Sequence, residues 1–134
     1  MKTGFDFLDK VYKILNVATV TDVINGRIYR RWKPTNSELQ DMVISTLPTK
    51  YGEDIQSCTV VVNNYCKNLH FGLSNEVKLR EITDAVISVL EAYTQADGIY
   101  FNMDIVSENT MKDTDQPTMS YTSLRVNCIL QKKV

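Results

Sequence analysis

Two stretches of the chain carry apolar residues at helical spacing. The first is Asp6–Asn16, where Thr3 or Asp6 is a suitable cap and apolar side chains recur at i, i+3, i+4 and i+7. The second follows the capping residues Ser74 or Asn75 and is the stronger signal. Its apolar stripe consists of Ile82, Ala85, Val86, Val89, Leu90 and Tyr93. We predict two amphipathic helices, each with one face for a shared core.

Between the two helices the pattern favours β-structure. Val20–Ile24 is compatible with one more helical turn, and Asn25-Gly26 then suits a tight turn with positive φ. Runs rich in β-branched residues follow, and the third of them is expected to be central because it is apolar on both faces. These predicted strands are Arg27–Arg30, Met42–Leu47, which Pro48 stops, and Ser57–Tyr65.

The C-terminal part alternates between apolar and polar residues. Ile99–Ile105 and Leu124–Leu130 have the period of two that is typical of a strand with one buried face. Ser107–Met119 lies between them and is polar, so we expect it to be an exposed, mobile hairpin loop that could take part in assembly. Its candidate assembly residues are Ser107, Lys112, Asp113, Asp115 and Pro117.

The predicted element order is α-β-β-β-α-β-β. Such an order favours an α+β fold with a mixed or antiparallel sheet of about five strands and two helices packed on one face. The chain has 134 residues, of which 43% are hydrophobic, which suits one core. We therefore expect one domain over residues 1–134.

Charge and cysteine content restrict the possible partners. Fifteen basic and sixteen acidic residues give a net charge of -1, so no overall field attracts nucleic acid or anionic lipid. Neither a signal peptide nor an apolar run of membrane-spanning length is present, so we expect a soluble protein with no membrane partner. Cys58 and Cys66 would lie about 26 Å apart on one strand, at roughly 3.3 Å per residue. This separation is too great for a disulfide between Cys58 and Cys66. We expect reduced, buried thiols, and an interstrand disulfide with Cys128 is the alternative.

The sequence offers little for catalysis. His70 is the only histidine, and the glycines form no phosphate-binding loop. Cys66 with His70 could be imagined as a nucleophile and base, and Asp54 as an acid, which would make a small enzyme. The acidic pairs Glu53/Asp54 and Asp113/Asp115 sit in polar turns where solvated carboxylates are ordinary. We expect no catalytic residue, no metal and no cofactor.

One segment is unusual because four basic residues interleave with two aromatic ones. Basic groups neutralise phosphates and aromatic rings stack on bases, so the segment could bind single-stranded nucleic acid. Arginine and aromatic residues are also enriched where protein subunits meet, and charge protects an edge strand. We favour a subunit interface over a DNA-facing surface. The candidate residues are Arg27, Tyr29, Arg30, Arg31, Trp32 and Lys33.

Several segments of the chain carry a family resemblance when they are taken in order. The opening helix is followed by Asn25–Tyr29 and Pro34, and then by Asn36-Ser37-Glu38 leading to Asp41–Pro48. The strand ending in Val61–Tyr65, the long helix and the final hairpin come next. This order resembles phage tail terminator proteins, also called tail completion or minor tail proteins of head-tail joining, and the second segment resembles versions from phages and prophages of gut Bacteroidales.

The resemblance implies a non-enzymatic virion protein. Members of that family form a ring, usually of six subunits, that caps the tail tube and meets the head-side connector. The implied partners are further copies of the chain, the major tail tube protein and the connector, with DNA passing through the lumen without recognition. The implied location is the tail or neck of the virion, and the host cytoplasm during assembly. A head-tail connector or neck-ring protein is the alternative within the virion.

Overall fold

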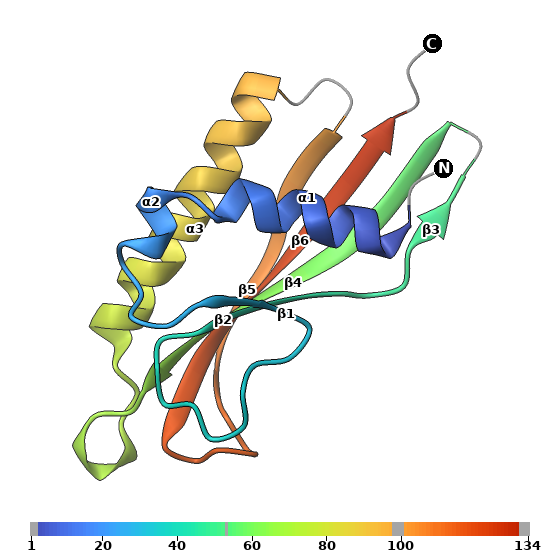
Figure 1. The fold of residues 1–134 in the computed structure, drawn as a ribbon. Helices are drawn as coiled ribbons and strands as arrows, with labels where there is room; N and C mark the ends of the chain where they lie inside the picture. Colours follow the sequence, from blue (N-terminus) through green and yellow to red (C-terminus); the bar gives the residue numbers. More distant parts are fainter. Residues whose placement is uncertain (1–2, 53, 98–100, 132–134) are drawn as a thin grey trace.

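The protein is represented by a computed structural model that describes residues 3–52, 54–97 and 101–131, with only the backbone described for 95–97 (Figure 1). Its helices are α1 (Gly4–Leu15), α2 (Ala18–Thr21), the 3-10 turn η1 (His70–Gly72) and α3 (Glu76–Asp97). Its strands are β1 (Ile28–Arg30), β2 (Met42–Thr46), β3 (Lys50–Tyr51), β4 (Ile55–Lys67), β5 (Phe101–Lys112) and β6 (Met119–Gln131).

The strands form one mixed sheet in the order β1-β2-β4-β6-β5, with the short β3 paired to β4. β1 runs parallel to β2, and all other pairings are antiparallel. The predicted α+β class and the central position of the third predicted strand are confirmed. β3 was not predicted, because two exposed residues give no periodic signal.

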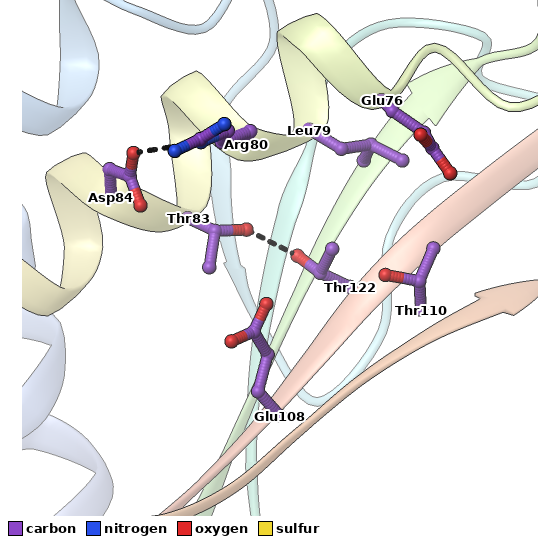
Figure 2. Close-up of a pocket in the computed structure, with 8 residues that line it drawn as sticks. All are labelled: Glu76, Leu79, Arg80, Thr83, Asp84, Glu108, Thr110 and Thr122. Carbon is purple, nitrogen blue, oxygen red and sulfur yellow. Dashed lines mark hydrogen bonds and ion pairs between the residues drawn. The ribbon is translucent and has the colours of Figure 1, made fainter.

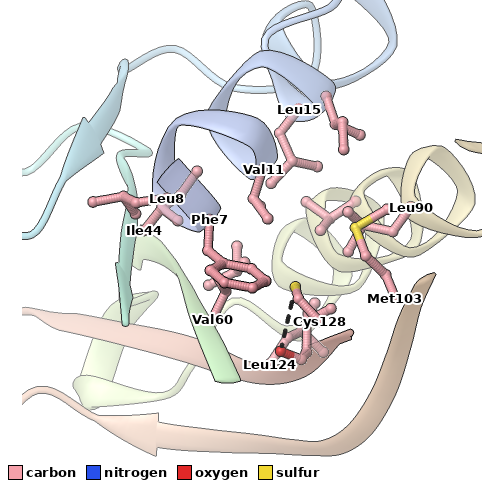
Figure 3. Close-up of a cluster of buried hydrophobic side chains, with 14 of the residues drawn as sticks. Phe7, Leu8, Val11, Leu15, Ile44, Val60, Leu90, Met103, Leu124 and Cys128 are labelled. Atoms are coloured by element: carbon pink, nitrogen blue, oxygen red, sulfur yellow. Dashed lines mark hydrogen bonds between the residues drawn. The ribbon is translucent and has the colours of Figure 1, made fainter. Parts of the chain in front are cut away.

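Both long helices cover the same face of the sheet (Figure 1). The alternation along β4 shows this directly, because its even-numbered residues from Gln56 to Cys66 are buried and the odd-numbered ones between them are partly exposed. Phe7 and Val11 of α1 and Leu90 of α3 meet Val60 of β4 in this core, as Figure 3 shows. Within the described residues, the opposite face of the sheet carries no helix.

Two local predictions before β1 are corrected. The helical turn lies at Ala18–Thr21, earlier than the predicted Val20–Ile24. Positive φ occurs among the described residues at Arg31, Asn36, Phe71 and Gly72, so Asn25-Gly26 is not a positive-φ turn. Gly26 is needed for space: a Cβ there would collide with Oδ1 of Asp41 and lie 2.7 Å from the carbonyl oxygen of Gln40.

The predicted hairpin loop Ser107–Met119 is also wrong over most of its length. Ser107 and Lys112 belong to β5, which pairs with β6 as far as Lys112–Ser120, after a bulge between Ile105 and Ser107. Only residues 113–118 connect the strands. The polar composition misled the prediction because this end of the edge strand is exposed on both faces. The predicted start of the strand, Ile99, lies outside the described residues.

Candidate functional site

The basic segment lies at the β1 edge of the sheet and in the loop that follows. Tyr29 and Arg30 end the short edge strand, and Arg31 then takes a positive φ of 69° that turns the chain away from the sheet. Trp32 follows with 79% of its surface exposed. A three-residue strand that ends in this way blunts the sheet edge while presenting a large aromatic side chain.

The basic side chains of the segment have different intramolecular partners. Arg30 forms an ion pair with Asp9 and lies over the ring of Tyr12, with 4.4 Å from its guanidinium carbon to the ring centre. Arg31 lies 5.1 Å from the centre of the Phe5 ring. Both arginines thus attach β1 and its loop to α1.

Lys33 is held on another side of the molecule. Its Nζ donates to the carbonyl oxygen of Ser37 at 2.9 Å and to Oε1 of Gln116 at 3.2 Å, and lies 4.8 Å from the ring centre of Tyr65. Gln116 is in the β5–β6 connection, so Lys33 joins the loop to the hairpin tip. The four cations are therefore not one continuous basic strip. This arrangement favours the predicted interface role over a phosphate-binding track.

Arg27 and Trp32 differ from their neighbours. Within the described residues, neither the Arg27 guanidinium nor the Trp32 indole has a polar partner, and both side chains are exposed. Arg27 is anchored only through its backbone, whose N–H donates to Oδ1 of the buried Asp41 at 3.2 Å. The exposed part of the segment is thus a cation and an indole on a fixed backbone.

A groove lies at the other edge of the sheet, between α3 and the outer half of the β5–β6 hairpin (Figure 2). It holds about 350 Å³. Hydroxyl groups form its floor: Thr83 and Thr122 share a hydrogen bond of 2.7 Å, and Nδ2 of Asn64 donates to Thr122 at 3.2 Å. The groove is lined by Glu76, Leu79, Arg80, Thr83, Asp84, Glu108, Thr110 and Thr122.

Carboxylates surround this hydroxyl floor. Asp84 pairs with Arg80 at 3.8 Å, but Glu76 and Glu108 form no ion pair within the described part of the chain. Thr110 and Thr122 lie between these two carboxylates in Figure 2. The described residues contain no cluster of three His, Cys, Asp or Glu side chains suited to a metal. Among the described residues, the groove therefore presents two carboxylates without an ion-pair partner, those of Glu76 and Glu108.

An exposed apolar loop, which the sequence patterns did not identify, lies beside the groove. Leu69, Phe71 and Leu73 around η1 and Val77 at the start of α3 are all exposed, and Phe71 is exposed completely. Phe71 has a φ of 63°, which is rare for a bulky residue. The N–H of Leu69 donates to the carbonyl oxygen of Leu73 at 2.7 Å and closes the loop. The loop is thus a preformed apolar projection.

The residues considered for catalysis lie in surroundings that do not activate them. Cys66 is buried in β4, and burial raises the pKa of its thiol, which opposes formation of the nucleophilic thiolate. His70 is exposed in η1, Asp54 is exposed in the β3–β4 turn, and Glu53 lies outside the described residues.

Asp113 and Asp115 share the hairpin connection, where Oδ1 of Asp113 accepts the N–H of Asp115 at 3.0 Å. The assembly role of Ser107, Lys112, Asp113, Asp115 and Pro117 stays a prediction.

The buried thiols should resist modification until the protein opens. All three are free and buried, Cys58 directly opposite Cys128 on the neighbouring strand. Burial raises the pKa of Cys128 from 9.0 to about 12, so its thiol stays protonated where an unfolded cysteine would ionise. We expect an aromatic disulfide reagent at pH 8 to label the native chain at the rate of unfolding.

The same burial predicts a pH dependence of stability. Because the pKa of the Cys128 thiol is higher in the folded chain than in the unfolded one, the free energy of unfolding should fall as the pH rises from 9 toward 12.

A surface cysteine provides the control for the thiol-labelling experiment. Ser88→Cys on the exposed side of α3 should react within the mixing time of the reagent. Native thiols that react as fast as this added one would contradict the burial of all three.

Comparison with known proteins identifies a solved structure with a similar fold. No family model and no curated protein gives a significant match to the sequence. The chain is similar in structure to a protein of the virion of a native gene transfer agent particle, with a TM-score of 0.54 and 12% identity. The similarity covers 91% of this chain and 92% of that chain. No helix in the described ranges is long and apolar enough to cross a bilayer. The two chains share their fold over almost their whole length.

Proposed function

We propose that the protein is a non-enzymatic structural subunit of a phage-like virion, of the tail terminator or tail completion kind. The fold shared with a gene transfer agent virion protein carries this proposal, because it extends over more than nine tenths of both chains. The resemblance of the sequence to tail terminators points to the same class of protein. The expected location is the tail or neck of the particle, and the host cytoplasm during assembly.

In this role the chain forms a ring, expected to hold six subunits, at the head-proximal end of the tail tube. Its partners are further copies, the major tail tube protein and the head-side connector, while DNA passes through the lumen without recognition. The near-zero net charge suits such a passage, since a strongly basic lumen would retain DNA. A ring of identical subunits requires different contact surfaces on two sides of each subunit, and β1 and β5 are distinct free edges of the sheet.

Assembly and tube binding test the proposal. The concentrated protein is examined by native mass spectrometry and electron microscopy, with and without purified tail tubes. We expect rings that are free in solution or that sit at one end of each tube. A protein that stays monomeric at high concentration and leaves tubes uncapped would contradict it. Rings that bind isolated connectors but never tubes would favour the neck-ring alternative.

A further inference from the structure

We propose that copies of this chain join head to tail, with the β1 edge of one copy docked on the β5 edge of the next. The docking surface on the β1 edge, here called the basic edge, is formed by Arg27 and Trp32. Its receiving surface, the acidic edge, is formed by Glu76, Val77 and Glu108. This inference rests on the proposed ring and assigns its subunit contact.

The sheet places the two surfaces on opposite edges, and the row of paired residues that joins these edges starts at Arg30, which lies between Arg27 and Trp32 in the chain, and ends at Glu108. Arg30 pairs with Ile44, Ile44 with Val62, Val62 with Leu124, and Leu124 with Glu108. Four steps of about 4.8 Å separate the ends of this row by about 19 Å. One copy therefore cannot bring its own two edges together. A contact between them is heterologous and continues from copy to copy until a rotation closes the ring.

Strand directions are compatible with this arrangement. β1 runs with β2, and each following step to β4, β6 and β5 reverses direction. β1 is consequently antiparallel to β5. Copies placed edge to edge in the same orientation present antiparallel neighbours, the commoner strand arrangement in sheets.

The two edges are complementary in charge. The Arg27 guanidinium has no ion-pair partner within the described ranges, and neither Glu76 nor Glu108 has one. The other cations of the basic segment are held by α1 or by the hairpin tip, so Arg27 is the charge available to a partner. Opposite charges that are unpaired in one copy and meet in the next would favour this register and disfavour others.

Apolar surface accompanies the charge on both sides. Trp32 on the basic edge is 79% exposed, and Val77 on the acidic edge is 82% exposed beside Glu76. Tryptophan and arginine are the residue types that most often dominate binding energy at protein interfaces. A DNA strand bound at Arg27 and Trp32 would leave the acidic edge unused. A second copy uses both edges, which is why we infer this occupant.

Charge reversal provides the test. Arg27→Glu places like charges at every contact of a ring, and so does Glu108→Lys, so each variant alone should stay monomeric under conditions where the wild type assembles. A mixture of the two should assemble, because the carboxylate introduced at position 27 of one variant faces the ammonium introduced at position 108 of the other, while the remaining contacts keep Arg27 against Glu108. Native mass spectrometry of the mixture should show alternating rings with even subunit numbers only. The double variant Arg27→Glu/Glu108→Lys should assemble by itself.

Matched reversals control for net charge and folding. Lys13→Glu and Glu91→Lys change exposed residues of α1 and α3 that form no ion pair in the described structure, and should assemble like the wild type. Circular dichroism checks that each variant is folded. If the wild type forms rings and both reversals still do, the inference fails while the ring proposal stands. If the wild type neither assembles nor caps tubes, both fail.

Discussion

Phe7→Ala should lower the free energy of unfolding by about 3–5 kcal/mol, the usual cost of removing a buried aromatic ring. Phe7 is only 2% exposed, and its ring centre lies 6.1 Å from that of Phe101 in β5. It enters the core from α1 and meets residues of α3 and of the sheet there (Figure 3). A cavity at this place would loosen the attachment of α1 to the sheet. Urea denaturation followed by circular dichroism measures the loss.

Phe5 gives a matched control in the same helix turn. It is mostly exposed, and its only ring contact in the described structure is the guanidinium of Arg31. An exposed cation–π contact contributes about 0.5–1 kcal/mol, so Phe5→Ala should cost no more than about 1 kcal/mol. Equal losses for the two variants would mean that α1 is not held to the sheet through Phe7.

The contrast between these phenylalanines illustrates what the sequence predicts well. Periodicity identified both long helices and the strands that they cover, because one buried face imposes a regular pattern on each element. Thr3, one of the two predicted caps, does cap α1: its N–H donates to a carboxylate oxygen of Asp6 at 2.8 Å. The pattern is lost where the helices no longer cover the sheet. Ser107–Lys112 therefore resembled a loop although it is an edge strand.

The candidate surfaces were only partly predictable, for a related reason. The basic segment is contiguous in sequence, so its composition alone drew attention to it. The groove is not contiguous, because it brings Glu76 and Thr83 of α3 next to Glu108 of β5. Exposure of Phe71 depends on a loop conformation that no local apolar period indicates. The intramolecular partners of Arg30 and Lys33 are also distant in sequence, so only the tertiary structure shows that these two cations are already paired.

Asp41→Ala should have the second large effect and lower the free energy of unfolding by about 1–3 kcal/mol, because it leaves two partly buried hydrogen-bond donors without this acceptor. Asp41 is 1% exposed. Its Oδ1 accepts the N–H of Arg27 at 3.2 Å, and its Oδ2 accepts the hydroxyl of Ser37 at 2.6 Å. One carboxylate thus fixes the start of β1 and the loop that carries Trp32. Urea denaturation gives the global cost of losing it.

The local consequence separates this residue from an ordinary core position. Hydrogen exchange of the Arg27 amide should accelerate in Asp41→Ala by more than the global destabilisation explains, since that N–H loses its acceptor. Asp41→Asn keeps one carbonyl oxygen and should protect the amide in part. If the basic edge is the subunit contact, assembly should weaken in the same order, Ala more than Asn. Unchanged Arg27 exchange in Asp41→Ala would show that β1 holds the basic edge in place without this carboxylate, because the parallel pairing with β2 would then suffice.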